Sequence, residues 1–280
     1  MNLESAQERP ADPLTERTPR VVSAVKLLRT AERRKTGRFL AEGENSVTEA
    51  LATGVVHDLF VTDAAAERYP HVLATARQRG VRVGLVTERA AERLSDTVTP
   101  PGLVAVCDLL DVPLDAALAS NPRLLAVPVG MSEPGNAGTL IRVADAVGAD
   151  AVILAGDSVD PHNGKCVRAS AGSVFHLPLA RERDTGRVLD ALAAAGVQIL
   201  ATAADGEVDL DDADRLLRAP TAWLFGNEAH GLDPDIAARA DHRVRIPIRG
   251  RAESLNLATA ASICLYSSAR VQHRTPGPIA

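Results

Sequence analysis

Aromatic residues are scarce in this sequence, at 2% of its 280 residues. Proteins that bind single-stranded nucleic acids often stack the bases on aromatic rings, so this chain cannot depend on such platforms. Cysteine is also rare, and Cys107, Cys166 and Cys264 are too scattered for a disulfide framework or a zinc site. We therefore expect neither structural disulfides nor a bound metal.

Long apolar runs are missing as well, since none reaches the roughly 18 residues of a membrane span. Residues 1–20 are polar, contain prolines and lack the apolar stretch of a signal peptide. These two absences predict a cytoplasmic protein with no membrane partner.

Positive charge is in short supply overall, because the formal net charge is −5, but it is concentrated in one segment. A negative net charge argues weakly against a nucleic-acid partner, although the distribution of charge matters more than its sum. Residues 17–38 hold one acid, Glu32, against these bases: Arg17, Arg20, Lys26, Arg29, Arg33, Arg34, Lys35 and Arg38. Either a solvated helix face or a phosphate-binding surface would account for the segment.

Helix-like and strand-like segments alternate along the chain, which indicates the α/β class. The segment 110–121 carries Pro113 and no strong strand signal, so we expect a linker there. The predicted division is a flexible tail at 1–18, a domain at 19–109, this linker, a second domain at 122–272 and a tail at 273–280. In the first domain we expect helices at 20–30, 44–53, 64–80 and 87–96, and strands at 38–43, 55–62, 81–87 and 102–109.

The second domain begins with the apolar run RLLAVPV and continues the alternation to a terminal helix from about Leu255. This pattern predicts a mostly parallel sheet with helices on both faces. Such sheets bind ligands beyond the carboxyl ends of their strands. The candidate loops are therefore those after Val129, Phe225 and Ile248.

The first candidate loop leads into the helical stretch NAGTLIRVADAVG. Asn136 and Gly138 lie near the helix start, where free backbone N–H groups can meet an anion, and Arg142 follows on the first turns. The loop lacks the G-x-G-x-x-G spacing of a dinucleotide site, and GDSVDPHNGKC lacks the spacing of a phosphate-binding loop. A helix cap followed by a surface arginine remains the plain alternative.

The second candidate loop reads WLFGNEAHGLD. Gly226 permits a tight backbone where a ligand comes close, and the pair Asn227–Glu228 is more polar than a connection needs. A simple β-to-α connection is the alternative.

The third candidate loop, IPIRGRAESLNLATAA, places Arg249 and Arg251 ahead of two small polar residues. We expect Ser254 to cap the terminal helix. We expect Asn256 inside that helix, which is nearly free of charge and therefore buried. A buried amide needs hydrogen-bond partners, and partners at the sheet edge indicate a site.

The order and spacing of three stretches are more specific than any one loop. NAGTLIR, LFGNEAHGLD and IPIRGRAESLNLATAA resemble, in sequence order, the three motifs of the SpoU/TrmH family of RNA 2′-O-ribose methyltransferases, which belongs to the SPOUT superfamily. The stretch GKCVRASAGSVFHLP is similar to the family's segment between the first two motifs. In the first half, RRKTGRFLAEGENSVTEAL resembles the family's small RNA-recognition domain, an α/β fold like certain ribosomal proteins.

The resemblance implies a fold, a cofactor and partners. The second domain would be a mostly parallel α/β SPOUT domain tied in a deep trefoil knot, preceded by the small RNA-recognition domain. The cofactor would be S-adenosylmethionine. The partners would be RNA, with 23S rRNA favoured over tRNA, and a second copy of the chain. That homodimer would form through the C-terminal domain, by the terminal helix and the helix after the first motif.

The resemblance also assigns residues, which are named by the role it implies. The catalytic set is Arg142, Glu228, Ser254 and Asn256. The cofactor would be held by Thr202, Gly226, Asn227, Ile246 and Leu255. RNA would be bound by Arg33, Arg34, Lys35, Asn136, Arg168, Arg249 and Arg251.

This sequence departs from the family pattern at a few positions. Pro101 stands where the family often has glutamine, and Ala229–His230 replaces a pair that usually contains glycine. Two alternatives stay open: a tRNA 2′-O-methyltransferase, and a non-catalytic RNA-binding factor in ribosome assembly.

Overall fold

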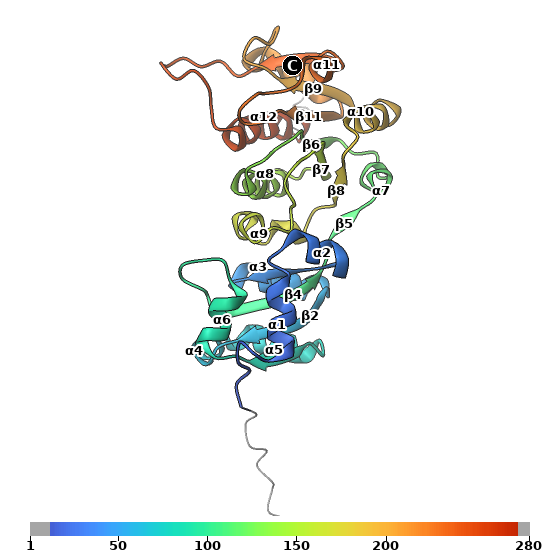
Figure 1. The fold of residues 1–280 in the computed structure, drawn as a ribbon. Coiled ribbons are helices and arrows are strands. Elements are labelled where there is room, and N and C mark those ends of the chain that lie inside the picture. Colours follow the sequence, from blue (N-terminus) through green and yellow to red (C-terminus); the bar gives the residue numbers. More distant parts are fainter. Residues whose placement is uncertain (1–11, 274–280) are drawn as a thin grey trace, which may run out of the picture. The chain divides into compact units, whose positions relative to one another are not determined.

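The computed structural model describes residues 12–273, and the chain divides after Asp108 into two compact units (Figure 1). Within the described residues, no helix is both long and apolar enough to cross a membrane. The three cysteines are unpaired and buried. Burial raises the pKa of the Cys166 thiol to about 12.

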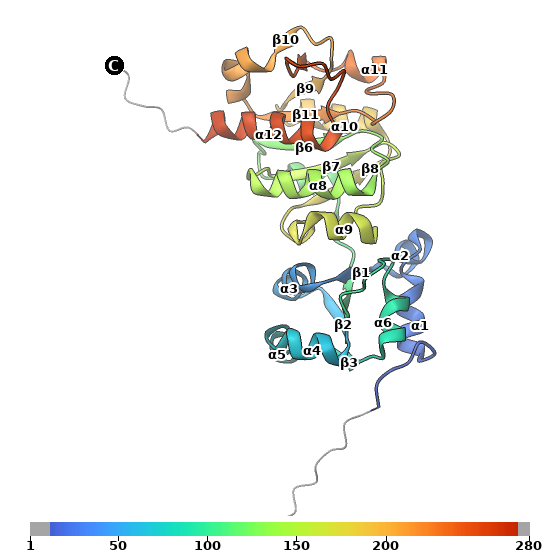
Figure 2. The same ribbon diagram turned by 90° about the vertical axis from the view of Figure 1, so that its left-hand side faces the viewer.

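The first unit is a four-stranded sheet with the order β1-β4-β2-β3, in which β4 runs antiparallel to both of its neighbours. Helices α3, α4 and α5 lie on one face of this sheet, and α1 and α6 lie on the other (Figure 2). The elements are α1 (Pro19–Lys26), α2 (Thr30–Thr36), β1 (Arg38–Glu42), α3 (Glu44–Thr53), β2 (Val56–Val61), α4 (Asp63–Arg68), α5 (Pro70–Gln78), β3 (Arg82–Leu85), α6 (Glu88–Leu94) and β4 (Leu103–Asp108).

Three expectations for this unit are corrected. The helix expected at 20–30 ends at Lys26, and a second helix that was not expected, α2, begins at Thr30. The helix at 64–80 breaks at Tyr69, because a residue before proline is crowded out of the helical region. The predicted tail at 1–18 includes Leu14, whose N–H donates to Leu85 O at 2.8 Å and which forms a bridge with Val86. Residues 1–11 of that tail lie outside the described part of the chain.

The second unit is an eight-stranded sheet with the order β10-β12-β9-β11-β6-β7-β8-β5, in which the neighbouring strands run parallel. This confirms the predicted mostly parallel sheet. Its elements are β5 (Asp111–Val112), α7 (Leu114–Leu118), β6 (Leu124–Pro128), α8 (Pro134–Ala146), β7 (Ala151–Ala155), α9 (Gly164–Ser170), η1 (Ser173–Phe175), β8 (Leu179–Glu182), α10 (Thr185–Ala194), β9 (Gln198–Thr202), β10 (Val208–Asp209), η2 (Leu210–Arg218), β11 (Thr221–Phe225), α11 (Pro234–Ala237), β12 (His242–Arg245) and α12 (Leu257–Gln272).

The predicted linker at 110–121 is corrected by this sheet. Asp111 and Val112 form strand β5, which pairs with Leu179 and Ala180 of β8. Helix α7 follows directly and buries Leu114 in the core. The segment is therefore the first strand and helix of the second unit.

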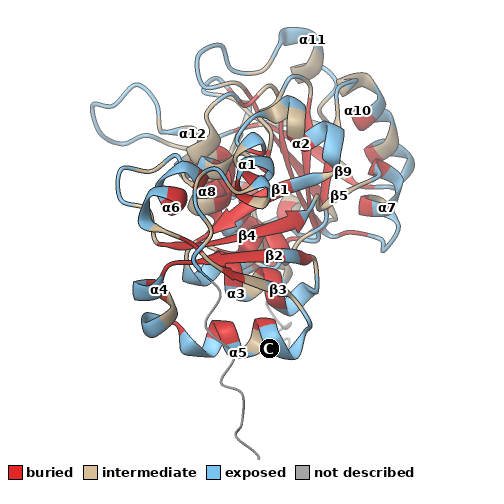
Figure 3. Cartoon of the chain, turned by 60° about the horizontal axis from the view of Figure 1, so that its bottom comes forward, coloured by how far each residue is buried: buried red, intermediate tan, exposed pale blue. Residues whose placement is uncertain are grey.

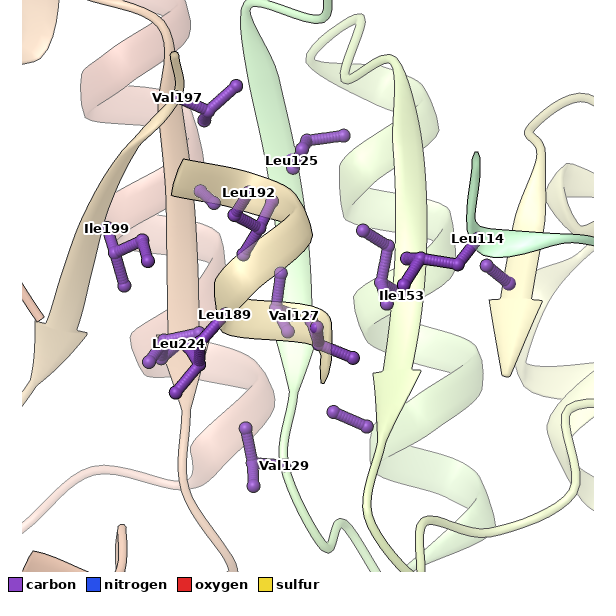
Figure 4. Packing of buried hydrophobic residues seen from close by; sticks show 14 of the residues in the cluster. Leu114, Leu125, Val127, Val129, Ile153, Leu189, Leu192, Val197, Ile199 and Leu224 are labelled. Carbon is purple, nitrogen blue, oxygen red and sulfur yellow. The ribbon is translucent and has the colours of Figure 1, made fainter. Parts of the chain in front are cut away.

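The central strands of the second sheet are buried on both faces, as their apolar runs predict. Strands β2 and β4 of the first sheet are also mostly buried (Figure 3). On one face, Leu189 and Leu192 of α10 pack with Leu125 and Val127 of β6 (Figure 4). Helices α8 and α12 cover the other face. There the indole of Trp223 donates a hydrogen bond of 2.9 Å to Ser268 Oγ, which joins β11 to α12.

Candidate functional site

Two of the candidate loops leave the sheet side by side. Strands β6 and β11 pair in register, with Phe225 opposite Pro128, and the N–H of Val129 donates to Phe225 O at 2.8 Å. The segments that follow β6 and β11 therefore both leave the sheet at its carboxyl edge. The topology therefore brings the first and second loops together, as parallel strands require.

Glu228 joins these two loops through its carboxylate. The carboxylate accepts hydrogen bonds from the backbone N–H groups of Ser132 and Glu133, each at 3.1 Å. It also accepts from Ser132 Oγ at 3.1 Å and from Asn136 Nδ2 at 3.2 Å. Partial burial opposes ionisation, but these donors outweigh it and lower the pKa of Glu228 below its usual range. The second loop thus holds the first in one conformation.

Asn136 extends this network to the third loop. Its Oδ1 accepts a hydrogen bond of 3.1 Å from Asn256 Nδ2, while its own amide nitrogen donates to Glu228. The line Glu228–Asn136–Asn256, which we call the motif network, therefore connects all three loops. Sequence reasoning named each of the three residues but did not predict that they bond to one another.

Two expectations about the third loop are corrected. Asn256, not Ser254, is the N-cap of α12: its Oδ1 accepts from the N–H groups of Ala258 at 2.9 Å and Thr259 at 3.3 Å. Asn256 is also exposed, so its bonds do not arise from the need to satisfy a buried amide. With Oδ1 occupied by the helix end, Nδ2 is the group directed to Asn136.

The start of α8 is fixed by residues that sequence reasoning did not assign to the site. Glu133 caps this helix by accepting from the N–H of Gly135 at 2.9 Å, and Lys165 Nζ lies 2.7 Å from the same carboxylate. The hydrogen bond from Lys165, followed by that from Gly135, lowers the pKa of Glu133. Pro134, directly after Glu133, was the available signal for this helix start, because proline favours the first helical position.

Gly138 serves the packing of α8 against α9. A Cβ at this position would lie 2.3 Å from the carbonyl oxygen of Cys166 and 2.6 Å from Ala169 Cβ. Only glycine lets α8 approach α9 this closely. The structure thus gives this glycine a packing role that the sequence did not predict.

A pocket of about 160 Å³ lies beside the third loop, at the carboxyl ends of β9 and β12. Three predicted cofactor residues, Thr202, Ile246 and Leu255, line it, and so does Ser254 from the predicted catalytic set. The hydroxyl of Thr202 donates to Leu224 O at 3.0 Å, which fixes that wall to β11.

Gly226 and Asn227 are not among the residues that line this pocket. A Cβ on Gly226 would lie 2.3 Å from the carbonyl carbon of Gly231, so the glycine lets the second loop fold onto itself. Asn227 Nδ2 donates to Gly130 O at 2.7 Å and ties this loop to the one after β6. Both residues therefore shape the loop next to the pocket.

The predicted cations are placed differently from one another. Arg142 on α8 and Arg251 are exposed, and within residues 12–273 neither forms a hydrogen bond or ion pair. Arg249 is exposed and pairs with Asp211. Arg168 on α9 is half-buried. Arg142 and Arg251 thus keep their guanidinium groups available for a ligand.

Arg33 corrects the prediction of an RNA contact. It is 2% exposed, and its guanidinium donates to the carbonyls of Leu27 and Leu28 and to Thr30 Oγ1 at 2.9 to 3.0 Å. The side chain holds the turn between α1 and α2 and cannot reach a phosphate. Arg34 and Lys35 on the same helix are exposed.

Metal ligands do not cluster anywhere in the part of the chain that the structure describes. His230 is exposed on the second loop. The polar side chains of the site therefore carry amide, carboxylate, hydroxyl and guanidinium groups.

Comparison with known families matches both units. Residues 123–266 match the SpoU rRNA methylase family, and residues 18–105 match the MRM3-like substrate binding domain. The first of these ranges contains Arg142 and the whole motif network. The second contains Arg34 and Lys35.

Named relatives extend over most of the chain. It is 36% identical over 242 residues to the 23S rRNA (guanosine(2553)-2′-O)-methyltransferase RlmP of Bacillus subtilis (strain 168), which covers 86% of this chain and 92% of that protein. It is 33% identical over 245 residues to the 23S rRNA (uridine(2479)-2′-O)-methyltransferase of Streptomyces viridochromogenes, which covers 85% of each.

A solved structure shows the same fold. The AdoMet-bound rRNA methyltransferase from Sinorhizobium meliloti superposes with a TM-score of 0.78 and 34% identity, covering 90% of this chain and 94% of that one. AdoMet is S-adenosylmethionine. The similarity to that protein includes both units.

Proposed function

The chain belongs to the SpoU rRNA methylase family, and from this premise we propose that it methylates the ribose 2′-hydroxyl of an RNA nucleotide with S-adenosylmethionine as the methyl donor. We place the nucleotide in large-subunit rRNA, because the two named relatives act on 23S rRNA. The observation that carries the proposal is the motif network, which binds three loops together beside a pocket. Helix α8, which carries Asn136 of this network, also carries Arg142.

The pocket next to the third loop fits the cofactor in its chemistry. Its walls are mostly aliphatic, from Ala203, Val244, Ile246 and Leu255, which suits the flat face of an adenine. Glu253 is the one charged residue among those that line it, so no cation opposes a sulfonium. When bound, S-adenosylmethionine supplies an electrophilic methyl group. Thr202, Ile246 and Leu255 would hold it, with Gly226 and Asn227 shaping the adjoining loop.

Arg142 binds and polarises the substrate in this proposal. A guanidinium has a pKa above about 12, so it stays protonated and cannot take a proton from the ribose. It can bind the phosphate next to the reacting ribose and hold the hydroxyl in a near-attack position. As the ribose oxygen takes the methyl group, the bond from that methyl carbon to the sulfonium sulfur would break, and the hydroxyl proton would pass to an oxygen of the phosphate that Arg142 holds.

Glu228, Asn256 and Ser254 position the reacting nucleotide. Glu228 and Asn256 fix the loops around Asn136, so the groups that face the RNA are set before it binds. Ser254 lines the cofactor pocket two residues before Asn256. Because this arrangement needs no rearrangement at the moment of reaction, it favours the transition state.

Further cations would guide the RNA backbone to the site. Arg251 is exposed, and its side chain is free to bind a phosphate. Arg249 would give up its ion pair with Asp211 to bind a phosphate. Arg168, Arg34 and Lys35 complete the proposed contacts. Binding of this kind depends strongly on salt and carries little sequence information.

A homodimer completes the proposal. Helices α8 and α12 leave an apolar pocket open to solvent, lined by Val143, Ala146, Val147, Ser262, Ile263 and Tyr266. Tyr266 is 63% exposed there, which is unusual for a large side chain on an apolar surface. A second copy of the same two helices would cover it.

A trefoil knot also belongs to the proposal. The chain leaves β12, runs through the third loop, and returns to pack α12 on β6 and β11 at the middle of the sheet. A knot would lie where this returning segment passes the third loop.

The test compares two arginine variants in a methyl-transfer assay with tritiated S-adenosylmethionine and 23S rRNA. Arg142→Ala should lose about 10²- to 10³-fold in transfer rate, as removal of one such charged donor does elsewhere. Its affinity for the cofactor, measured by calorimetry, should stay unchanged. Arg218→Ala is the matched control, because Arg218 is exposed just before β11, at the opposite edge of the sheet.

Full transfer by Arg142→Ala would remove the catalytic assignment. The same assay with tRNA distinguishes the substrates, since label in tRNA and none in rRNA would replace the rRNA proposal. Cofactor binding and RNA binding without any transfer would indicate a non-catalytic assembly factor.

A further inference from the structure

A pocket of about 540 Å³ lies in the first unit, on the sheet face that α1 covers. We call it the arginine pocket. Its lining includes one residue from each strand of the sheet and two polar residues of α1: Arg38, Val106, Asp58, Arg82, Arg20 and Ser23. Its volume lies within the range of about 300–1,000 Å³ that is typical of ligand sites.

Strand register places the charged residues of this pocket on one face of the sheet. Val106 of β4 stands opposite Asp58 of β2, and Asp58 stands opposite Arg82 of β3. Arg38 begins β1 two residues before Leu40, which pairs with Val106 and so shares its face. This same face carries the apolar core under α1 and α6. Charge within such a row is costly unless it is paired or serves a ligand.

Asp58 holds two of the arginines in fixed positions. Its carboxylate accepts from Arg82 Nε at 2.6 Å and Nη2 at 2.9 Å, and from Arg20 Nη2 at 2.7 Å. Burial opposes ionisation, but the bonds from Arg82 and Arg20 outweigh it and lower the pKa of Asp58. With three arginines and one carboxylate, the lining carries a formal charge of 3 − 1 = +2.

Arg20 is positioned from two further sides. Its guanidinium carbon lies 5.4 Å from the centre of the Phe60 ring. On the neighbouring strand, Gly84 leaves room for it: a Cβ there would lie 3.3 Å from Arg20 Nη1 and 2.9 Å from Leu14 Cδ1. The guanidinium is therefore set in place before any ligand arrives.

The arginine pocket offers donors that the chain itself does not use. Within the described residues, neither the Arg38 side chain nor the Ser23 side chain has a hydrogen-bond or ion-pair partner. Arg82 bonds Asp58 through Nε and Nη2, which leaves Nη1 for a ligand. Arg20 Nε also has no acceptor in the described structure, but it is buried and a ligand cannot reach it. A pocket of unused donors fits a ligand that only accepts hydrogen bonds.

We propose that the arginine pocket binds a phosphodiester group of the RNA substrate, an inference that rests on the proposed function. Guanidinium forks match the oxygens of a phosphate in shape and charge. Thr36 of α2 also lines the pocket, and the exposed Arg34 and Lys35 lie just before it, so the positive charge continues along α2. RNA follows such a track with successive phosphates.

The experiment measures RNA affinity of the full-length protein by fluorescence anisotropy, using an unmodified 23S rRNA transcript at several KCl concentrations. Arg38→Ala removes a side chain that supports no other contact, so the fold should be intact. We expect Kd to rise roughly tenfold, as for the loss of one charged hydrogen-bonded contact. The slope of log affinity against log salt should fall by about one. Arg38→Glu should weaken binding further.

The matched controls are Arg77→Ala and Arg77→Glu, because Arg77 is exposed on α5, on the opposite face of the sheet. They should leave Kd and the salt slope unchanged. For Arg38→Ala, the rate of methyl transfer at saturating RNA and the affinity for S-adenosylmethionine should equal those of the unaltered protein. A thermal unfolding midpoint equal to that of the unaltered protein confirms that each variant is folded.

The outcomes separate this inference from the proposed function. If the Arg38 and Arg77 variants have the same RNA affinity and salt slope, and methyl transfer is intact, the arginine pocket does not bind the RNA. The proposed function would then stand without it. RNA binding that depends on Arg38 in a protein that transfers no methyl group supports the pocket and removes the function. Displacement of RNA from the unaltered protein by polyglutamate, but not from Arg38→Glu, would indicate an acidic protein partner and overturn the inference.

Discussion

At the scale of single residues, Glu228 does the most to organise the site. One carboxylate receives three hydrogen bonds from the first loop, two of them from backbone N–H groups, and a fourth from Asn136 of α8. Glutamine could accept fewer of these bonds and would place an amide nitrogen against N–H donors. The charge of Glu228 is therefore part of the loop structure, even though we assign it no proton transfer.

The lowered pKa of Glu228 predicts a pH dependence with a definite sign. The ionised group stabilises the fold at pH values above its unfolded pKa of about 4.3, and this stabilisation is lost as pH falls through the lower folded value. Glu228→Gln should unfold at lower urea concentration at pH 7, and the difference should shrink as pH falls from about 5 to 3. Glu253→Gln, an exposed glutamate of the third loop, is the control.

Equal differences between Glu228→Gln and the unaltered protein at pH 7 and pH 3 would contradict this role. Urea midpoints suit the measurement, because a protein of two units need not unfold in a single step.

At the scale of elements, the sequence predicts those helices and strands that are long enough to show a pattern of apolar residues. The runs RLLAVPV, AVILAG and TAWLFG are buried strands because both faces of the sheet are covered. Strand β5 has two residues, too few to show a period, so its segment looked like a linker. Periodicity also cannot show that Arg33 folds back onto the carbonyls of Leu27 and Leu28, since those contacts depend on the turn.

The same limit applies to the candidate site. Motif order identified Asn136, Glu228 and Asn256, but their bonds link residues 92 and 120 positions apart. Local propensity likewise could not choose between Ser254 and Asn256 as the cap of α12. Only the fold brings Asn256 to the helix end and to Asn136 at once.

The double role of Asn256 predicts a difference between two variants. Asn256→Ala removes both the cap and the bond to Asn136, and should lower the free energy of unfolding by about 1 kcal/mol for the cap. Asn256→Asp keeps an acceptor for Ala258 and Thr259 but loses the donor to Asn136. We expect Asp to restore stability and not methyl transfer. Recovery of transfer by Asn256→Asp would show that the motif network is not needed.

At the scale of the whole molecule, the exposed apolar face of α8 and α12 predicts self-association. The unaltered protein should sediment at twice 29.4 kDa. Tyr266→Lys places a charge at the centre of that face and should shift the mass to that of one chain. Val98→Lys is the control, because Val98 is a fully exposed apolar residue of the first unit. A single-chain mass for the unaltered protein at micromolar concentration contradicts the dimer.

The central claim is that a methyl group reaches a ribose oxygen of rRNA. The most direct measurement is mass spectrometry of nucleosides from 23S rRNA incubated with the protein and S-adenosylmethionine. The account predicts one 2′-O-methylated nucleoside, formed at the same rate by the unaltered protein and by Arg218→Ala and far more slowly by Arg142→Ala. A methyl group on a base, or equal product from Arg142→Ala, would contradict it.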